Sequence, residues 1–170
     1  MLWPQSLYEL RKNFEAGVSL FYSSSTGSIK RALDQLLANE RIEVESEGGS
    51  RGKKVYAVTD WGRQEFRRWM LAEMTGGDLE AAVLARVYFL GLLEPHERAV
   101  VAGHIEERLR EELGHLERLE ARTSTVQVPE GFEKIAEFQL ATLQFGLISC
   151  RAALTWAEQH LPQPSTKPDR

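Results

Sequence analysis

The stretch "RIEVESEGGSRGKKVYAVT", residues 41–59, contains two short runs of strand-forming residues around a turn. In the first run, Ile42 and Val44 fall on one face, while Glu43 and Glu45 fall on the other. The second run, "KVYAVT", is rich in β-branched residues, and the segment between the runs, "EGGSRGK", is rich in turn-forming glycines. The stretch therefore predicts a β-hairpin with a cationic tip.

Helical patterns flank this hairpin on both sides. Before it, "SLYE" at Ser6–Glu9 predicts a capping box at the start of a helix that ends near Gly17. A second helix follows the polar segment "SSSTGS", and we expect Asn39 to be its left-handed C-cap. The apolar stripe of this second helix is Ile29, Leu33, Leu36 and Leu37. After the hairpin, "TDWGRQEFRRWMLAEM" predicts a third helix with Thr59 as its N-cap.

The segment "TGGD" at 75–78 predicts a boundary between two domains. Beyond it, helices are expected over about 79–93, 95–121 and 129–160, and the last carries more large apolar residues than one helix face can hold. We therefore predict a mainly α protein with a first domain at 1–74 and a helical dimerisation domain at 78–160. Residues 161–170 have the composition of a disordered tail.

Composition excludes several classes of protein. No apolar run approaches the roughly 18 residues that a membrane span requires. The one cysteine, Cys150, rules out an internal disulfide framework, so a cytoplasmic protein is expected. The net charge of −4 is uneven, because residues 1–70 hold eleven Lys/Arg against nine Asp/Glu and the remainder holds ten against sixteen. The acidic balance thus says little against an anionic partner for the first part.

Helix, helix, two-stranded hairpin, helix is the order of a winged helix-turn-helix. In that fold the second helix enters the major groove of double-stranded DNA, and a basic wing follows the phosphate backbone. The predicted DNA contacts are Thr26, Ser28, Lys30, Arg31, Arg51, Lys53 and Lys54. Any one of these charges alone fits an ordinary solvated surface, but together with the element order they favour DNA binding, with groove contacts from the helix and backbone contacts from the wing.

Enzymatic interpretations of the sequence fail on spacing. The segment "GGSRGKK" is one residue too short for a phosphate-binding loop, has Lys54 where a hydroxyl is needed, and leads into a strand. Glu112 and His115 form half of a di-iron motif without a second pair. No cofactor, metal site or catalytic residue is predicted, although an enzyme built on the C-terminal helices stays an open alternative.

Three patterns resemble the PadR-type transcriptional regulators: "YELRKNF", "GSIKRAL" and "KVYAVTDWG". The resemblance implies a homodimer with exchanged C-terminal helices, a palindromic operator, and repression relieved by a small, often aromatic, effector. The chain departs from the family at Lys30, where tyrosine is common, and at Glu40 and Arg41, where a glycine often stands. It also has only "MLWPQS" where the family carries a full helix, so either Leu2 and Trp3 replace that helix or the true start lies upstream.

An effector site is expected between the two predicted domains. Its candidate residues are Trp69, Phe89 and Trp156, each of which also fits ordinary core packing. The alternative function is a winged-helix protein-interaction module that no longer binds DNA, which the acidic pI of 5.7 favours.

Overall fold

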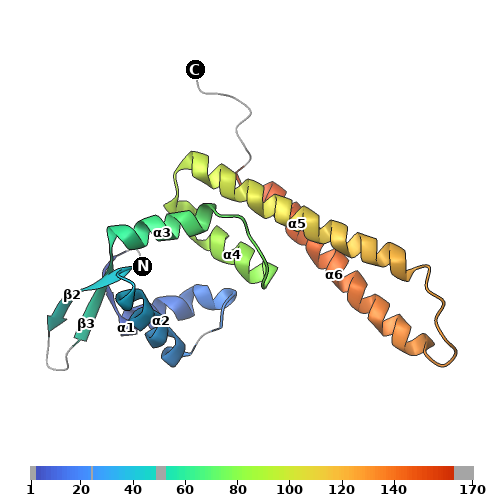
Figure 1. Cartoon of the computed structure of the whole chain (residues 1–170), viewed down its shortest axis with the longest axis horizontal. Coiled ribbons are helices and arrows are strands. Elements are labelled where there is room, and N and C mark those ends of the chain that lie inside the picture. Colours follow the sequence, from blue (N-terminus) through green and yellow to red (C-terminus); the bar gives the residue numbers. More distant parts are fainter. Residues whose placement is uncertain (1–2, 24, 49–52, 163–170) are drawn as a thin grey trace, which may run out of the picture. The chain divides into compact units, whose positions relative to one another are not determined.

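The computed structural model describes residues 3–23, 25–48 and 53–162, which form two compact units, Met1–Leu93 and Glu94–Arg170. Helices make up most of both units, and the first unit holds one small sheet (Figure 1). The predicted fold class, a mainly α winged helix-turn-helix followed by a helical part, is confirmed.

The first unit begins with two capped helices. In α1 (Leu7–Ala16) the amide of Ser6 donates to the Glu9 carboxylate at 2.8 Å, and the Glu9 amide donates to Ser6 Oγ at 3.4 Å. The predicted capping box is therefore present, and Gly17 ends the helix as expected. A short 3₁₀ turn (Val18–Leu20) leads to α2 (Thr26–Ala38), whose N-cap is Ser25.

The hairpin consists of β2 (Ile42–Gly48) and β3 (Lys53–Val58), paired antiparallel with Ile42 opposite Val58. The sequence did not predict a third strand, β1 (Gln5–Ser6), which pairs with β3 on its other edge. The sheet order is β1-β3-β2. A two-residue strand is too short to show the alternation from which strands are predicted.

Asn39 is the C-cap of α2 as predicted, but it does not have the left-handed conformation that was expected of it. Asn39 has a φ of −96°, whereas Glu40 takes the left-handed conformation with a φ of 56°. The amide of Arg41 donates to the Leu36 carbonyl at 2.8 Å, and that of Glu40 donates to Leu37 at 3.0 Å. This bonding pattern is a Schellman motif, which places the left-handed residue one position after the cap.

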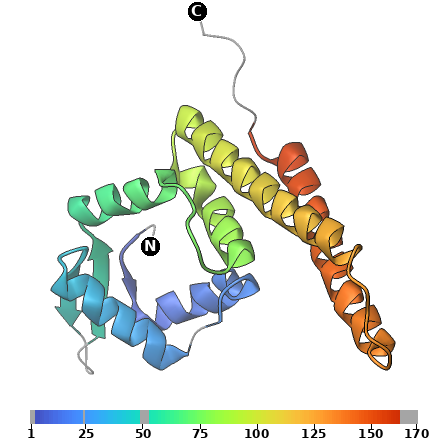
Figure 2. The ribbon, with the colours of Figure 1, turned by 45° about the vertical axis from the view of Figure 1, so that its right-hand side comes forward.

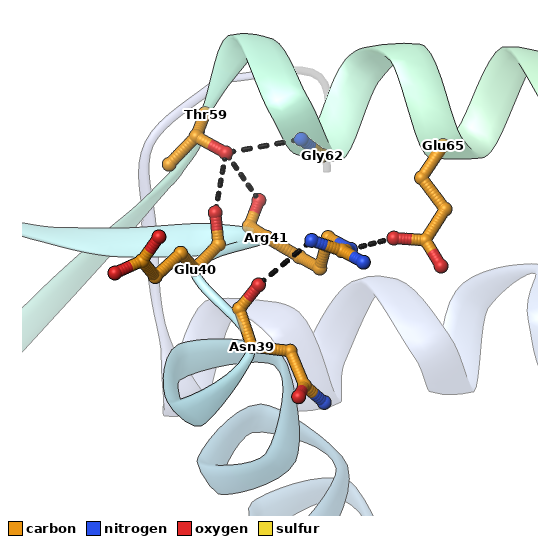
Figure 3. Close-up of polar contacts among 6 residues, drawn as sticks. All are labelled: Asn39, Glu40, Arg41, Thr59, Gly62 and Glu65. Atoms are coloured by element: carbon orange, nitrogen blue, oxygen red, sulfur yellow. Dashed lines mark hydrogen bonds and ion pairs between the residues drawn. The ribbon is translucent and has the colours of Figure 1, made fainter.

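A polar joint connects the end of α2 to α3 (Asp60–Leu71), as Figure 3 shows. Thr59 Oγ1 accepts from the Gly62 amide at 3.0 Å and lies 2.7 Å from the Glu40 carbonyl oxygen, to which it donates. The Arg41 side chain donates to the Asn39 carbonyl at 2.8 Å and forms an ion pair with Glu65. These contacts fix the position of α3 relative to α2.

The helix α4 (Leu79–Phe89) and the 3₁₀ turn Leu90–Leu92 also belong to the first unit. The buried Arg86 side chain lies 3.4 Å from the Trp69 carbonyl oxygen and 4.8 Å from the centre of the Trp69 ring, and its burial lowers the pKa of the guanidinium. By its contacts this unit therefore extends beyond the boundary that "TGGD" predicts. The assignment of DNA-binding and dimerisation roles to residues 1–74 and 78–160 stays a prediction.

The second unit is a hairpin of two long helices, α5 (Pro95–Thr123) and α6 (Glu133–His160), which run side by side in Figures 1 and 2. The Cys150 thiol lies 3.4 Å from the Leu109 carbonyl oxygen, and Arg110 bridges Glu106 and Glu158 at 2.8 and 3.0 Å. The buried apolar residues of this hairpin include Val101, Ile105, Leu109, Leu147 and Ala157.

Two further sequence predictions concern the chain ends and the membrane. Of the predicted disordered tail, residues 163–170 lie outside the described part of the chain. None of the described helices is both long enough and apolar enough to cross a bilayer.

Candidate nucleic-acid interface

A concave, open cavity with a volume of about 720 Å³ lies between α1, α2 and β3 in the first unit. We call it the groove. Its lining residues are Ser6, Leu7, Tyr8, Arg11, Thr26, Lys30, Asp34, Leu37, Lys54 and Tyr56. The elements α1, α2 and β3, together with Ser6 of β1, thus present polar side chains to one surface. Thr26, Lys30 and Lys54 are residues that the sequence predicted as DNA contacts.

The α2 side of the groove is set by helical spacing. Thr26, Lys30 and Asp34 follow one another at intervals of four residues, which places them on one face of the helix. Leu33 on the inner face is buried and holds α2 against the rest of the unit. Lys30 forms no ion pair with any residue that the structure describes, so its ammonium group is available to a ligand.

Two predicted α2 contacts lie outside the groove lining. The Ser28 amide and hydroxyl lie 3.2 and 3.0 Å from the Ser25 hydroxyl, which stabilises the first turn of α2. Arg31 is exposed on the neighbouring face of the helix. Their contact with DNA stays a prediction.

The hairpin contributes Lys54 and Tyr56, which point to the same side because alternate residues of a strand share a face. Lys54 is exposed, and its Cα lies opposite that of Glu47 in the ladder. Arg51 and the side chain of Lys53 lie outside the described part of the chain, so their predicted roles at the wing tip stay predictions.

Sequence reasoning missed the α1 side of the groove, which presents Tyr8 and Arg11. Tyr8 is 68% exposed, and the Arg11 guanidinium lies 5.9 Å from the centre of its ring. Arg11 also pairs with Glu15 at 3.5 Å. The i, i+3 spacing of an aromatic and a cation could have indicated this pair, but the predictions for this helix rested on its apolar face alone.

The charge of the groove differs in sign from that of the whole chain. Its described lining holds Arg11, Lys30 and Lys54 against one acid, Asp34, although the chain carries a formal charge of −4. Three cations on three separate elements suit an extended anion better than a small one, because double-stranded DNA carries one negative charge per roughly 1.7 Å of its axis.

The predicted effector residues occupy two places. Trp69 and Phe89 both contact Phe66, with ring centres 5.9 and 5.8 Å apart, so the first unit brings these two together. Trp156 belongs to the second unit and stacks on His160 at 5.9 Å. An effector site that uses these residues stays a prediction.

The surroundings of Glu112 and Cys150 are those of residues that stabilise the fold. Glu112 pairs with Arg108 at 3.3 Å. Burial, and after it the charge of Glu112, raises the pKa of the Cys150 thiol, which disfavours the reactive thiolate. Within the described ranges, no group of three His, Cys, Asp or Glu side chains is placed to hold a metal ion.

The arrangement of α1, α2, the hairpin and α3 defines a winged helix-turn-helix protein. Residues 81–163 match the family model described as virulence activator alpha C-term. None of the curated proteins matches the chain.

Several solved structures are similar to this chain over most of its length. Bacillus subtilis PadR in complex with operator DNA is 20% identical, with a TM-score of 0.40 over 92% of this chain and 88% of that one. A PadR-like transcriptional regulator from Bacillus cereus is 25% identical, with a TM-score of 0.37 over 92% and 87%. The Vibrio cholerae virulence activator AphA is 17% identical, with a TM-score of 0.38 over 92% and 87%. Two of these three solved structures are of PadR or PadR-like proteins.

Proposed function

We propose that this protein is a DNA-binding transcriptional regulator. The observation that carries the proposal is the groove, in which Arg11, Lys30 and Lys54 from three elements converge on one concave surface. Arg11 and Lys54 are placed to neutralise phosphates and release counterions, which supplies affinity for DNA of any sequence.

The elements that line the groove contact different parts of the DNA. The exposed N-terminal half of α2 is the part that enters the major groove, where Thr26 and Lys30 meet base edges. Lys54 on the hairpin and Arg11 on α1 line the same groove and contact the backbone. Backbone contacts fix the register of the protein, and base contacts choose the sequence.

The functional form is proposed to be a homodimer, and α6 supplies the argument. One stripe of this helix packs in the hairpin with α5, where Leu147, Cys150 and Ala157 are buried. A second apolar stripe with alternating spacings of three and four residues is exposed: Phe138, Ala141, Phe145, Ile148 and Ala152. Phe138, Phe145 and Ile148 are 67%, 72% and 66% exposed.

Spacings of three and four residues are those of a coiled-coil seam, so the natural occupant of this outer stripe is the same stripe of a second copy. A twofold-symmetric dimer presents two α2 helices and therefore favours a palindromic operator. Following the sequence resemblance, we further propose a cytoplasmic repressor that is released from DNA by a small aromatic effector, with Trp69, Phe89 and Trp156 as the candidate contacts.

Selection of bound sites from random double-stranded DNA tests the proposal. We expect enriched sites with two inverted half-sites, and weaker binding when Lys30 and Lys54 are both replaced by alanine. Two such replacements at Lys134 and Arg151 on α6 give the same change in charge outside the groove and should leave affinity nearly unchanged. A wild-type protein that is folded but enriches no DNA, and binds none at low salt, would instead support the protein-interaction module.

A further inference from the structure

The groove contains one feature that general attraction to DNA does not explain, the acidic residue Asp34. It lies on the same face of α2 as Thr26 and Lys30 and lines the groove with them. Asp34 is exposed and forms no hydrogen bond or ion pair with the described residues. In particular, it does not pair with Lys30, one helical turn before it.

The surroundings of Asp34 give it no role in stabilising the fold. It is the ninth residue of α2, whereas an acid stabilises the helix dipole only in the first turn. The capping position belongs to Ser25, and the buried contact of this part of α2 is made by Leu33. Replacing Asp34 by asparagine should therefore leave the structure unchanged.

Facing DNA, a carboxylate weakens binding unless it finds a hydrogen-bond donor, because phosphates repel it. The major groove offers such a donor on cytosine, at N4, and on adenine, at N6, but the adenine N7 acceptor beside the latter repels a carboxylate. Guanine presents only acceptors there, at N7 and O6, which repel a carboxylate and attract an ammonium group. Lys30 and Asp34 therefore have opposite base preferences on one face of one helix.

We propose that Asp34 is a specificity-determining residue that selects a cytosine in each half-site, next to a guanine selected by Lys30. This inference rests on the proposed DNA-binding function. Four residues of helix span about 6 Å, so the two selected base pairs are expected one or two steps apart, since stacked pairs are separated by about 3.4 Å.

Site selection with wild-type protein and the Asp34→Asn variant tests this inference. Wild-type sites should favour cytosine over other bases by about 5-fold at one position of each half-site, the lower end of the range for a bidentate pair, because the carboxylate accepts from one amino group. The variant should lose that preference alone, keep the guanine preference, and bind unselected DNA at least as tightly as wild type, because one repulsive charge is gone. Lys30→Ala should show the converse, losing the guanine preference and keeping the cytosine preference.

A matched control is Glu43→Gln, which removes an exposed acid of β2 that is not part of the groove lining. It should leave every base preference unchanged, and equal thermal unfolding of all variants shows that the fold is intact. If Asp34→Asn keeps every wild-type base preference, the inference is overturned while the proposed function stands. If wild-type protein binds no DNA, the proposed function fails as well.

Discussion

At the scale of single residues, Gly62 stands where the backbone of a neighbouring segment leaves no room for a side chain. A Cβ atom built there would lie 2.0 Å from the Arg41 carbonyl oxygen, which is backbone and cannot move aside. We predict that Gly62→Ala lowers the free energy of unfolding by about 1–3 kcal/mol, the usual cost of overpacking. Urea unfolding would measure this. Gly27→Ala is the control, because its nearest contact is an ordinary 3.7 Å, and it should be neutral or stabilising.

Glu40 shows the opposite case, a residue held in a backbone conformation that suits glycine. Its left-handed φ of 56° costs a side-chain-bearing residue on the order of 1 kcal/mol or more. Glu40→Gly should therefore raise the free energy of unfolding by about 0.5–1 kcal/mol after the entropy of glycine is subtracted. The same change at Glu43, in extended strand, should be destabilising. An equal loss of stability in both variants would contradict the argument.

Gly62 and Glu40 also show which local features the sequence could not predict. The pattern "KVYAVTDWG" predicted a helix capped by Thr59, and the structure confirms it. It did not predict why glycine stands at position 62, because the Arg41 carbonyl that excludes a side chain is 21 positions away. Asn39 and Glu40 could not be distinguished, since the choice depends on which carbonyls of α2 the next two amides reach.

At the scale of elements, the sequence predicted every long helix and the hairpin, because their apolar periods extend over many residues. Some boundaries moved by a few residues, as at α6, which begins at Glu133 rather than near 129. The two-residue strand β1 and the α1 side of the groove were missed. Tyr8 and Arg11 become part of the candidate site only because tertiary packing brings α1 beside α2 and β3.

The hairpin and α2 should differ in what they contribute to DNA binding. Lys54→Ala should weaken binding to all DNA sequences alike, because phosphates carry no base identity. Each lost phosphate contact should flatten the log–log dependence of affinity on salt by about 0.9, and thus by up to about 1.8 in a dimer. Fluorescence anisotropy over a series of salt concentrations measures the slope. If Lys54→Ala changes base preference at constant slope, the hairpin reads bases instead.

At the scale of the whole molecule, dimerisation decides whether two α2 helices can act on one operator. Phe138 and Phe145 lie two helical turns apart on the exposed stripe of α6, and a monomer would leave both in water. Burying an aromatic side chain of this size is worth roughly 1.5–3 kcal/mol. Four such side chains in a symmetric pair would then supply a large part of the free energy of association.

We therefore predict that wild-type protein sediments as a dimer at low micromolar concentration, and that Phe138→Glu with Phe145→Glu makes it monomeric. Four buried charges cannot find partners across a symmetric apolar seam, so the dimer is lost rather than rearranged. Gln144→Glu, an exposed position of α6 off the stripe, should stay dimeric. The monomeric variant should keep its helical content, because the inner stripe of α6 is untouched, and it should lose high-affinity operator binding. A folded wild-type monomer, or a double variant that still dimerises, would show that the exposed stripe does not join two copies.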